Sequence, residues 1–348
     1  MKFLVIRFRQ MGDAVISTIL LNAIKKNFPG SETHFVLNEN LTSLFENHPA
    51  IDKVIPFSKE ERHTPMKYLA KIRKFMLKEK YDVVIDLRST MNTLPFSLFA
   101  FIANRHSRRI GIRKPYTRLL FTDTFADDST LYQGDQILSY LTPLNPSDIA
   151  QDRMTMNVTD AELKEYGEYL RGMGVDTARP ILLLGVVAKL AHKAWPADYI
   201  VDILQRIMKE FPDLQLIFNY APGAEEAMAR DIYRQLGSPA NVKIEVKAPS
   251  MRKLMCLARW STAYFGNEGG ARHIVEAVGR PSLSICSPNV PKGRCVRESA
   301  DTVTVALSDI ARPGDYENLD PADRYRLITP EAVWQRLNPF LHTHLSES

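Results

Sequence analysis

Short apolar runs alternate with amphipathic stretches along most of the chain, and this alternation predicts repeated strand–helix units. The strands predicted in the first half are residues 3–6, 33–37, 53–56, 82–86 and 109–112. A helix predicted between the first two strands begins at Asp13 and ends before Pro29 and Gly30. Because the strand runs are continuously apolar, they predict a parallel sheet that is buried on both faces.

The same rhythm restarts after a polar segment, residues 144–160, which contains Pro and Asn and shows no sustained periodicity. We therefore predict two domains, residues 1–155 and 156–348. The strands predicted in the second are residues 181–186, 214–218, 262–265 and 282–286, and the helices are residues 197–211, 224–236, 252–259, 270–278 and 330–337. Two doubly wound α/β domains facing each other would bring the carboxyl ends of both sheets to one ligand-binding cleft.

Composition is ordinary for a soluble protein of two domains: 348 residues, 45% hydrophobic and 24% charged. The longest apolar runs are too short to span a membrane, and the N-terminus lacks the apolar region of a signal peptide. Cys256, Cys286 and Cys295 are odd in number and match neither a C-x-x-C pair nor a zinc spacing. We therefore expect a cytoplasmic protein without a disulfide framework or a cysteine metal site.

The net charge of +5 is concentrated in the first half, where residues 1–150 hold 21 Lys and Arg against 15 Asp and Glu. Seven of these cations follow one another without an intervening acid: Arg88, Arg105, Arg108, Arg109, Arg113, Lys114 and Arg118. Two interpretations stand for this run, a site that attracts an anionic partner and a solvated basic surface.

The turn after the first strand, Arg7-Phe8-Arg9-Gln10-Met11-Gly12-Asp13, carries the first candidate for chemistry. Gly12 permits a tight turn, and Asp13 would lie at the carboxyl edge of the sheet, either as a helix N-cap or as a reactive carboxylate. The turn has one glycine where a dinucleotide fingerprint needs three, which disfavours a nicotinamide-dependent dehydrogenase.

Three strand-to-helix loops of the second half have residues suited to a nucleotide diphosphate. Gly269 and Gly270 permit close approach of phosphates to a helix start, with Glu268 for ribose hydroxyls and His273 for phosphate oxygens. Residues 187–196 offer Lys189 and Lys193 to neutralise a pyrophosphate beside a packed Trp195, and residues 222–226 offer Glu225 to a ribose. Each feature also has an ordinary structural explanation, as solvated lysines or as acids in the first turn of a helix.

Three motifs in order and spacing give the chain a family resemblance. They are Ile6-Arg7 with Met11-Gly12-Asp13-Ala14-Val15, then Lys193-x-Trp195-Pro196, then Gly266-Asn267-Glu268-Gly269-Gly270-x-x-His273 with Ala277 and Pro281. The sequence thereby resembles glycosyltransferase family 9, the lipopolysaccharide heptosyltransferases, which have the GT-B architecture of two Rossmann-like domains with parallel sheets facing across a cleft. Glu268 stands where the family usually has Asp.

The resemblance implies an inverting, metal-independent transferase without a cofactor, moving a heptose from ADP-heptose to a lipopolysaccharide core or related surface glycan. Residues 1–155 would bind the acceptor and residues 156–348 the nucleotide sugar, with the last helix free to pack back on the first domain. By position in the motifs, Asp13 would be the general base and Lys193 would neutralise the leaving group. The nucleotide sugar would be held by Glu225, Glu268, Gly269, Gly270 and His273.

The acceptor implied by the resemblance is an anionic glycolipid, which would contact Arg105, Arg108, Arg109 and Arg113. The basic amphipathic residues 67–76 either touch an anionic membrane peripherally or pack their apolar side against the sheet. No nucleic-acid partner is expected. Two alternatives remain open: a GT-B transferase or epimerase that uses another nucleotide sugar, and a nucleotide-binding module without catalysis.

Overall fold

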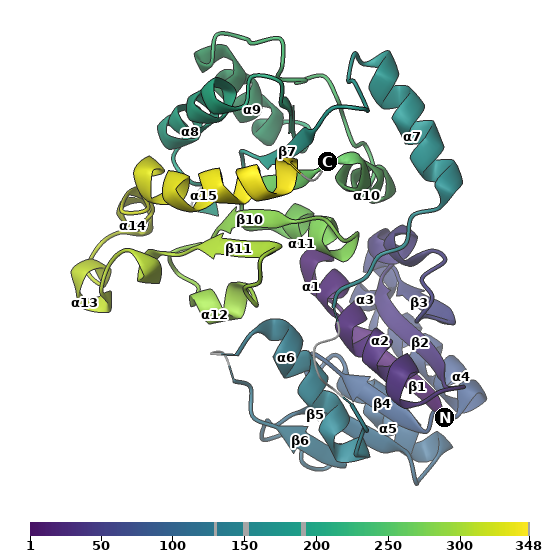
Figure 1. Cartoon of the computed structure of the whole chain (residues 1–348). Coiled ribbons are helices and arrows are strands. Elements are labelled where there is room, and N and C mark those ends of the chain that lie inside the picture. Colours follow the sequence, from purple (N-terminus) through teal and green to yellow (C-terminus); the bar gives the residue numbers. More distant parts are fainter. Residues whose placement is uncertain (129–130, 149–152, 189–192, 347–348) are drawn as a thin grey trace. The chain divides into compact units, whose positions relative to one another are not determined.

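A computed structural model describes residues 1–128, 131–148, 153–188 and 193–346 (Figure 1). The chain divides into two compact units, Met1–Asn157 and Val158–Ser348. Each unit is built around one parallel sheet with helices packed on it. The α/β class with Rossmann-like parallel sheets, predicted from continuous apolar strands, is therefore confirmed.

The sheet of the first unit has six strands in the order β3-β2-β1-β4-β5-β6, all paired in parallel. The strands are β1 (Lys2–Arg7), β2 (Glu32–Asn38), β3 (Lys53–Phe57), β4 (Val83–Asp86), β5 (Arg108–Ile112) and β6 (Asp123–Phe125). The helices are α1 (Met11–Ile16), α2 (Thr18–Asn27), α3 (Lys59–His63), α4 (Pro65–Glu79), α5 (Leu94–Ala103) and α6 (Gln133–Leu138), with 3₁₀ turns at Glu39–Phe45 and Ser139–Leu144. Phe3, Leu4, Val5 and Ile6 of β1 are fully buried because this strand is flanked on both edges and both faces.

The sheet of the second unit has five strands in the order β11-β10-β9-β7-β8, again all parallel. The strands are β7 (Ile181–Gly185), β8 (Gln215–Phe218), β9 (Ala263–Asn267), β10 (Ser282–Ile285) and β11 (Thr302–Val305). The longer helices are α7 (Asp160–Gly172), α8 (Ala197–Glu210), α9 (Ala224–Gln235), α10 (Met251–Trp260), α11 (Gly270–Ala277) and α15 (Pro330–Leu345), and the short ones are α12 (Lys292–Cys295), α13 (Pro313–Tyr316) and α14 (Pro321–Arg326).

The start of the first helix differs from the prediction. The N-cap of α1 is Gln10, which makes no side-chain capping bond, and Asp13 is the third residue of the helix, within its first turn. The predicted helix comprises α1 and α2, which are separated by Ser17 alone; this residue keeps helical dihedrals, and its N–H donates to the Asp13 carbonyl at 3.2 Å. The prediction that Asp13 caps this helix is therefore wrong, and its carboxylate is used elsewhere.

The last helix, α15, lies within the second unit. Its buried side chains Val333, Leu337, Phe340 and Leu341 belong to the same hydrophobic core as β7 and β9, and α15 packs against α8. The apolar face of the last helix, which from the sequence could also have packed on the first domain, is thus buried in the core of the second unit. Within the described part of the chain, no helix combines the length and apolarity needed to cross a membrane.

Candidate active site

Asp13 is held at the carboxyl end of β1 by two donors. The Nη2 of Arg7 donates to Asp13 Oδ1 at 2.8 Å, and the side-chain amide of Gln133 donates to the same oxygen at 2.9 Å. Arg7 is only 5% exposed, and its Nη1 donates to the carbonyl of Leu87 at 2.9 Å, which fixes the guanidinium between β1 and β4. The carboxylate is thus oriented by partners that the sequence did not assign to it.

Three further cations gather near Asp13 in the first unit. Arg9 Nη1 lies 3.8 Å from Asp13 Oδ1, and Arg88 Nη1 donates to the carbonyl of Phe8 at 3.2 Å. Burial, followed by repulsion from Arg9, lowers the pKa of Arg88, with Arg62 adding to the repulsion. A cavity of about 130 Å³ opens beside these groups and is lined by Phe8, Arg62, His63, Tyr68, Arg88, Thr90, Asn92 and Thr93. Like charges held this close favour an anionic group between them.

The expected acceptor cations are not brought to this place. Arg108 pairs with Val83, which pairs with Phe3, so β5 begins at the amino edge of the sheet, opposite the edge where Asp13 lies. Arg108 bonds Asp123 at 2.8 and 3.0 Å, whereas Arg109, only 8% exposed, donates to the Leu120 carbonyl at 2.7 Å.

Two more of these cations lie beyond the ends of β5. Arg105, before the strand, stacks over the Phe101 ring, and Arg113, after it, is exposed at the carboxyl edge. Arg105, Arg108 and Arg109 therefore lie away from the sheet edge that carries Asp13, because a run in sequence passes from one edge of a sheet to the other, and their contact with the acceptor stays a prediction.

In the second unit, the loop from β9 to α11 leaves backbone open at a helix start. Gly269 is the exposed N-cap of α11 and Gly270 its first residue. His273 is 8% exposed, and burial lowers its pKa well below the usual value, which makes the ring neutral at pH 7. Arg272 Nη2 lies 3.4 Å from His273 Nδ1. Because a guanidinium only donates, Nδ1 accepts and the ring proton resides on Nε2, where it can be donated to a ligand.

Asn267, which the sequence analysis did not single out, ties this loop to the one after β7. Its Nδ2 donates to the carbonyl of Gly185 at 3.0 Å, and its Oδ1 accepts from the backbone N–H of Trp195 at 2.7 Å. Asn267 is 3% exposed and Trp195 2%. The signal available in the sequence was an amide side chain at the end of an otherwise apolar strand. Two candidate loops are therefore fixed to one another through a single buried side chain.

The remaining candidates follow neighbouring strands. The loop carrying Lys193 follows β7, Glu225 follows β8, and Glu268 follows β9, and these strands are adjacent in the sheet. Lys193 is exposed, with its carbonyl accepting from Tyr325 at 3.0 Å, and Glu225 accepts from the backbone N–H of Ala221 at 3.1 Å. The structure thus brings the three loops to the carboxyl edge of the second sheet. Lys189 lies outside the described residues.

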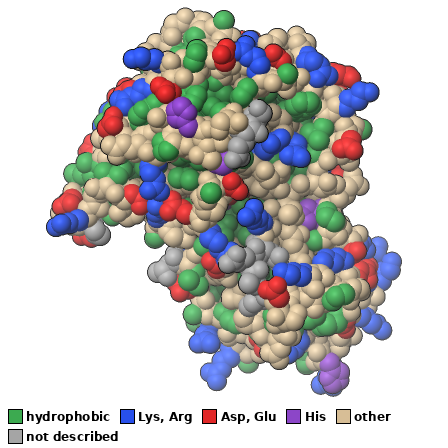
Figure 2. Space-filling view, viewed as in Figure 1, with side chains coloured by type: hydrophobic (Ala, Val, Ile, Leu, Met, Phe, Trp, Pro, Cys, Tyr) green, Lys and Arg blue, Asp and Glu red, His purple; other side chains and the backbone are tan. Residues whose placement is uncertain are grey.

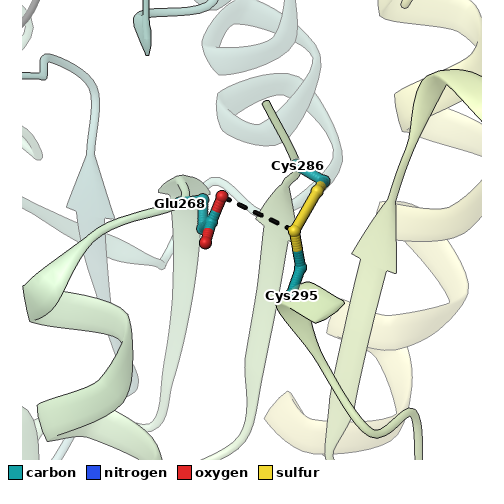
Figure 3. Close-up of side chains that lie close together, drawn as sticks. All are labelled: Glu268, Cys286 and Cys295. Carbon is teal, nitrogen blue, oxygen red and sulfur yellow. Dashed lines mark hydrogen bonds between the residues drawn. A yellow bond between two sulfur atoms is a disulfide. The ribbon is translucent and has the colours of Figure 1, made fainter. Parts of the chain in front are cut away.

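The cysteines depart from expectation. Cys286, after β10, and Cys295, in α12, form a disulfide, and the sulfur of Cys295 lies 3.6 Å from Glu268 Oε2 (Figure 3). Cys256 is a buried free thiol, and burial raises its pKa to about 11. The expectation that these cysteines have no pairing is wrong, because a strand end and a short helix bring together two residues with no recognisable spacing.

Solved structures with the same arrangement place the fold in the GT-B class of glycosyltransferases. A family 9 glycosyltransferase from Veillonella parvula superposes with a TM-score of 0.81 at 18% identity, covering 100% of this chain and 98% of the other. The Escherichia coli ADP-heptose lipopolysaccharide heptosyltransferase II superposes with a TM-score of 0.75 at 16% identity, with both chains fully covered.

The sequence itself identifies the family. The chain belongs to glycosyltransferase family 9 (heptosyltransferase), whose sequence model matches residues 69–308. A lipopolysaccharide heptosyltransferase 1 from Campylobacter coli is 24% identical over 82% of this chain and 83% of its own length. A lipopolysaccharide heptosyltransferase 3 from Escherichia coli K12 is 22% identical over 80% of each chain. The protein is therefore a glycosyltransferase, as the motifs predicted.

Gly266 offers a test of how closely the site loops are spaced. Its φ is +151°, and a Cβ at this position would lie 2.5 Å from the Gly185 carbonyl oxygen. We predict that Gly266→Ala lowers the unfolding free energy of the second unit by about 2 kcal/mol or more, because strand β9 must move away from β7. Urea unfolding followed by tryptophan fluorescence measures this unit alone, since Trp195, Trp260 and Trp334 all lie in it.

The matched control is Gly269→Ala. Gly269 has an extended φ of 171°, and a Cβ there meets no atom within 4 Å. This variant should unfold within about 0.5 kcal/mol of the parent. Equal stabilities for the two variants would contradict the close approach of β7 and β9.

Proposed function

We propose that this protein transfers heptose, with inversion, from ADP-heptose to a hydroxyl group of a lipopolysaccharide core or related surface glycan. The observation that carries the proposal is the convergence of the loops after β7, β8 and β9, with Lys193, Glu225 and Glu268, at one sheet edge. Two structures of one Escherichia coli relative in fold support the donor: heptosyltransferase WaaC was solved with ADP and with ADP-2-deoxy-2-fluoro heptose, at TM-scores of 0.72 and 0.70.

The nucleotide diphosphate is proposed to bind at this edge. The amides of Gly269 and Gly270 point from the start of α11 and suit phosphate oxygens, and His273 donates to them from Nε2. Glu225 and Glu268 accept from ribose hydroxyls. Lys193 neutralises the charge that develops on the departing ADP, and the helix start shares that charge, so the transfer proceeds without a metal ion.

Asp13 is the proposed general base. Arg7 and Gln133 both donate to its Oδ1, and among the described residues none bonds Oδ2, which leaves that oxygen for the acceptor hydroxyl. The hydroxyl oxygen forms a bond to the anomeric carbon as its proton passes to Oδ2. The bond from that carbon to the ADP oxygen breaks, and ADP leaves with the electron pair. One displacement from the face opposite the leaving group inverts the configuration.

An anionic group of the acceptor is proposed to bind beside Asp13, between Arg9, Arg62 and Arg88. The lowered pKa of Arg88 and the adjoining cavity support this location. Arg113, exposed at the same sheet edge, adds to the positive field. Arg105, Arg108 and Arg109 have no part in this proposal.

Peripheral contact with an anionic membrane is proposed for the surface formed by α4 and α5, which pack together. Leu98, Phe101 and Ile102 of α5 are 40%, 39% and 55% exposed at helical spacing. In α4, Ile72 and Met76 are buried, whereas exposed cations and apolar side chains share its outer surface: Met66, Lys67, Leu69, Arg73 and Lys74. Apolar side chains among lysines and arginines fit a surface of anionic headgroups. Figure 2 shows Lys and Arg side chains interspersed with hydrophobic and acidic ones on the viewed face.

Asp13→Asn should lower the transfer rate by about 100-fold or more, because the amide cannot take the hydroxyl proton. Its Oδ1 still accepts from Arg7 and Gln133, so ADP binding by calorimetry should not change. The control is Asp202→Asn, on the surface of α8, which should transfer at the parent rate. Near-parental turnover of Asp13→Asn would remove the carboxylate from the mechanism.

The double variant Arg62→Gln/Arg88→Gln should raise the KM of the acceptor and flatten its dependence on salt, because exposed charge is screened over about 8 Å at physiological ionic strength. The KM of the donor should not change. Arg105→Gln, a cation at the opposite sheet edge, is the control and should behave as the parent does. If Arg105→Gln alone raises the acceptor KM, the sequence run of cations is the acceptor site after all.

The membrane surface is tested by cosedimentation with vesicles containing phosphatidylglycerol. Phe101→Glu/Ile102→Glu should reduce the bound fraction by about 10-fold, since charged side chains replace apolar ones at the lipid boundary. Met228→Glu, an exposed apolar position of α9 in the second unit, is the control and should bind as the parent does. Unchanged binding of the double variant would exclude the α4–α5 surface.

A further inference from the structure

Three side chains at the carboxyl edge of the second sheet have the chemistry of metal ligands. One ligand atom from each of Glu268, Cys286 and Cys295 lies within 4.8 Å of the others. Glu268 follows β9, Cys286 follows the adjacent strand β10, and Cys295 ends α12 (Figure 3). None of the three motifs that carry the family resemblance includes either cysteine, and the transfer reaction proposed above uses no sulfur.

The backbone around the three side chains is fixed by hydrogen bonds. The N–H of Glu268 donates to the Ile285 carbonyl at 3.1 Å, and that of Cys286 to the Val305 carbonyl at 2.9 Å. The buried Arg272 donates from Nη2 to the carbonyl of Cys295 at 2.8 Å. Cys286 is fully buried and Cys295 3% exposed, whereas Glu268 is partly exposed. The cluster is therefore preorganised, with its opening on the carboxylate side.

The geometry accommodates two sulfur states. The Cα atoms of Cys286 and Cys295 are 6.7 Å apart, within the range of disulfides. Two thiolates on one tetrahedral zinc, at about 2.3 Å from the ion, have sulfurs about 3.8 Å apart, which side chains on the same two Cα atoms also reach. A modest rotation of both side chains thus converts one state into the other.

The surroundings of the Glu268 carboxylate differ between the disulfide and the reduced pair. In the disulfide, the Cys295 sulfur has no proton to donate to Glu268 Oε2, 3.6 Å away. Across the residues that the structure describes, no Lys or Arg forms an ion pair with Glu268. Two thiolates and a carboxylate within this distance repel one another, and a divalent cation between them replaces that repulsion with attraction. Two sulfur ligands select a thiophilic ion over Mg²⁺ or Ca²⁺.

We propose that Cys286, Cys295 and Glu268 bind a thiophilic divalent ion such as Zn²⁺ when the disulfide is reduced, and that oxidation of the pair expels the ion. A small-molecule thiol supplies the electrons: two thiols become one disulfide as the Cys286–Cys295 bond becomes two thiols. Binding Zn²⁺ then releases two protons, one from each cysteine. This inference shares Glu268 with the ribose contact proposed above but uses none of the groups of the transfer step, and metal binding measured without nucleotide tests it separately.

The test uses the full chain, reduced by a phosphine that is then removed without oxygen, with Co²⁺ as the spectroscopic probe. The reduced protein should bind one Co²⁺ with a thiolate-to-cobalt charge-transfer band, which Zn²⁺ abolishes by displacement. The oxidised protein should show no band. Since loss of an outer partner already weakens metal affinity by 10- to 100-fold, Cys286→Ser and Cys295→Ser should each weaken it by about 100-fold or more, and Glu268→Gln by at least about 10-fold.

Cys256→Ser is the matched control, because Cys256 is a buried thiol in α10 outside the cluster. It should bind Co²⁺ as the parent does. A second measurement needs no variant: Zn²⁺ should protect Cys286 and Cys295 of the reduced protein from alkylation, as peptide mass spectrometry reports, without protecting Cys256. The proposal is overturned if the reduced protein shows no thiolate band, if either serine variant binds Co²⁺ with the affinity of the parent, if Zn²⁺ gives no protection, or if thiols leave the disulfide intact in the folded chain.

Discussion

The buried amide of Asn267 is the interaction on which the second unit's site depends. The Nδ2 of this amide donates to the carbonyl at the end of β7, and its Oδ1 accepts from the backbone N–H of Trp195. A buried donor or acceptor without a hydrogen-bond partner costs about 1–3 kcal/mol. Separating the two loops would therefore cost free energy that is large compared with the stability of a domain. Trp195 in turn donates from its indole to the Ile328 carbonyl at 2.8 Å, which links these loops to the segment before α15.

In the first unit, a buried charged side chain has the corresponding role. Arg7 is buried at the end of β1, a placement whose desolvation cost is offset by the Asp13 carboxylate and the Leu87 carbonyl. The pKa of Arg7 is lowered chiefly by that burial and raised by Asp13. An arginine held in this way leaves Asp13 few orientations. In both units, therefore, a buried polar side chain at the carboxyl edge fixes residues that are proposed to carry the chemistry.

Much of the fold was accessible from the sequence because burial on both faces leaves a direct signature. The apolar runs that form β1, β7 and β9 do not alternate between polar and apolar residues, and the structure confirms the strands predicted there. The short strands β6 and β11 were missed, since their residues are largely half-exposed and lack that signature. α5 was missed for the opposite reason: it is apolar nearly all round, with Phe101 and Ile102 exposed, so no helical stripe stands out.

The candidate site was less accessible, because contacts between elements decide it. Nothing local distinguishes an Asp13 that caps a helix from one that bonds Arg7 and Gln133, which is 120 residues away. The cations from Arg105 to Arg113 are neighbours in sequence, yet β5 carries them across the width of the sheet. Cys286 and Cys295 meet only because a strand end and a short helix adjoin. The order of the motifs identified the family. The bonding partners of the candidate residues became clear only from the three-dimensional structure.

The central claim is that the carboxyl edge of the second sheet binds the nucleotide diphosphate, and hydrogen–deuterium exchange with and without ADP tests it most directly. With ADP at ten times its Kd, we expect about 10-fold slower exchange in peptides covering residues 193–197, 224–226 and 266–273. Peptides from residues 1–157 should be unaffected. Protection confined to residues 1–157, with unchanged exchange around Gly269 and Gly270, would contradict the account.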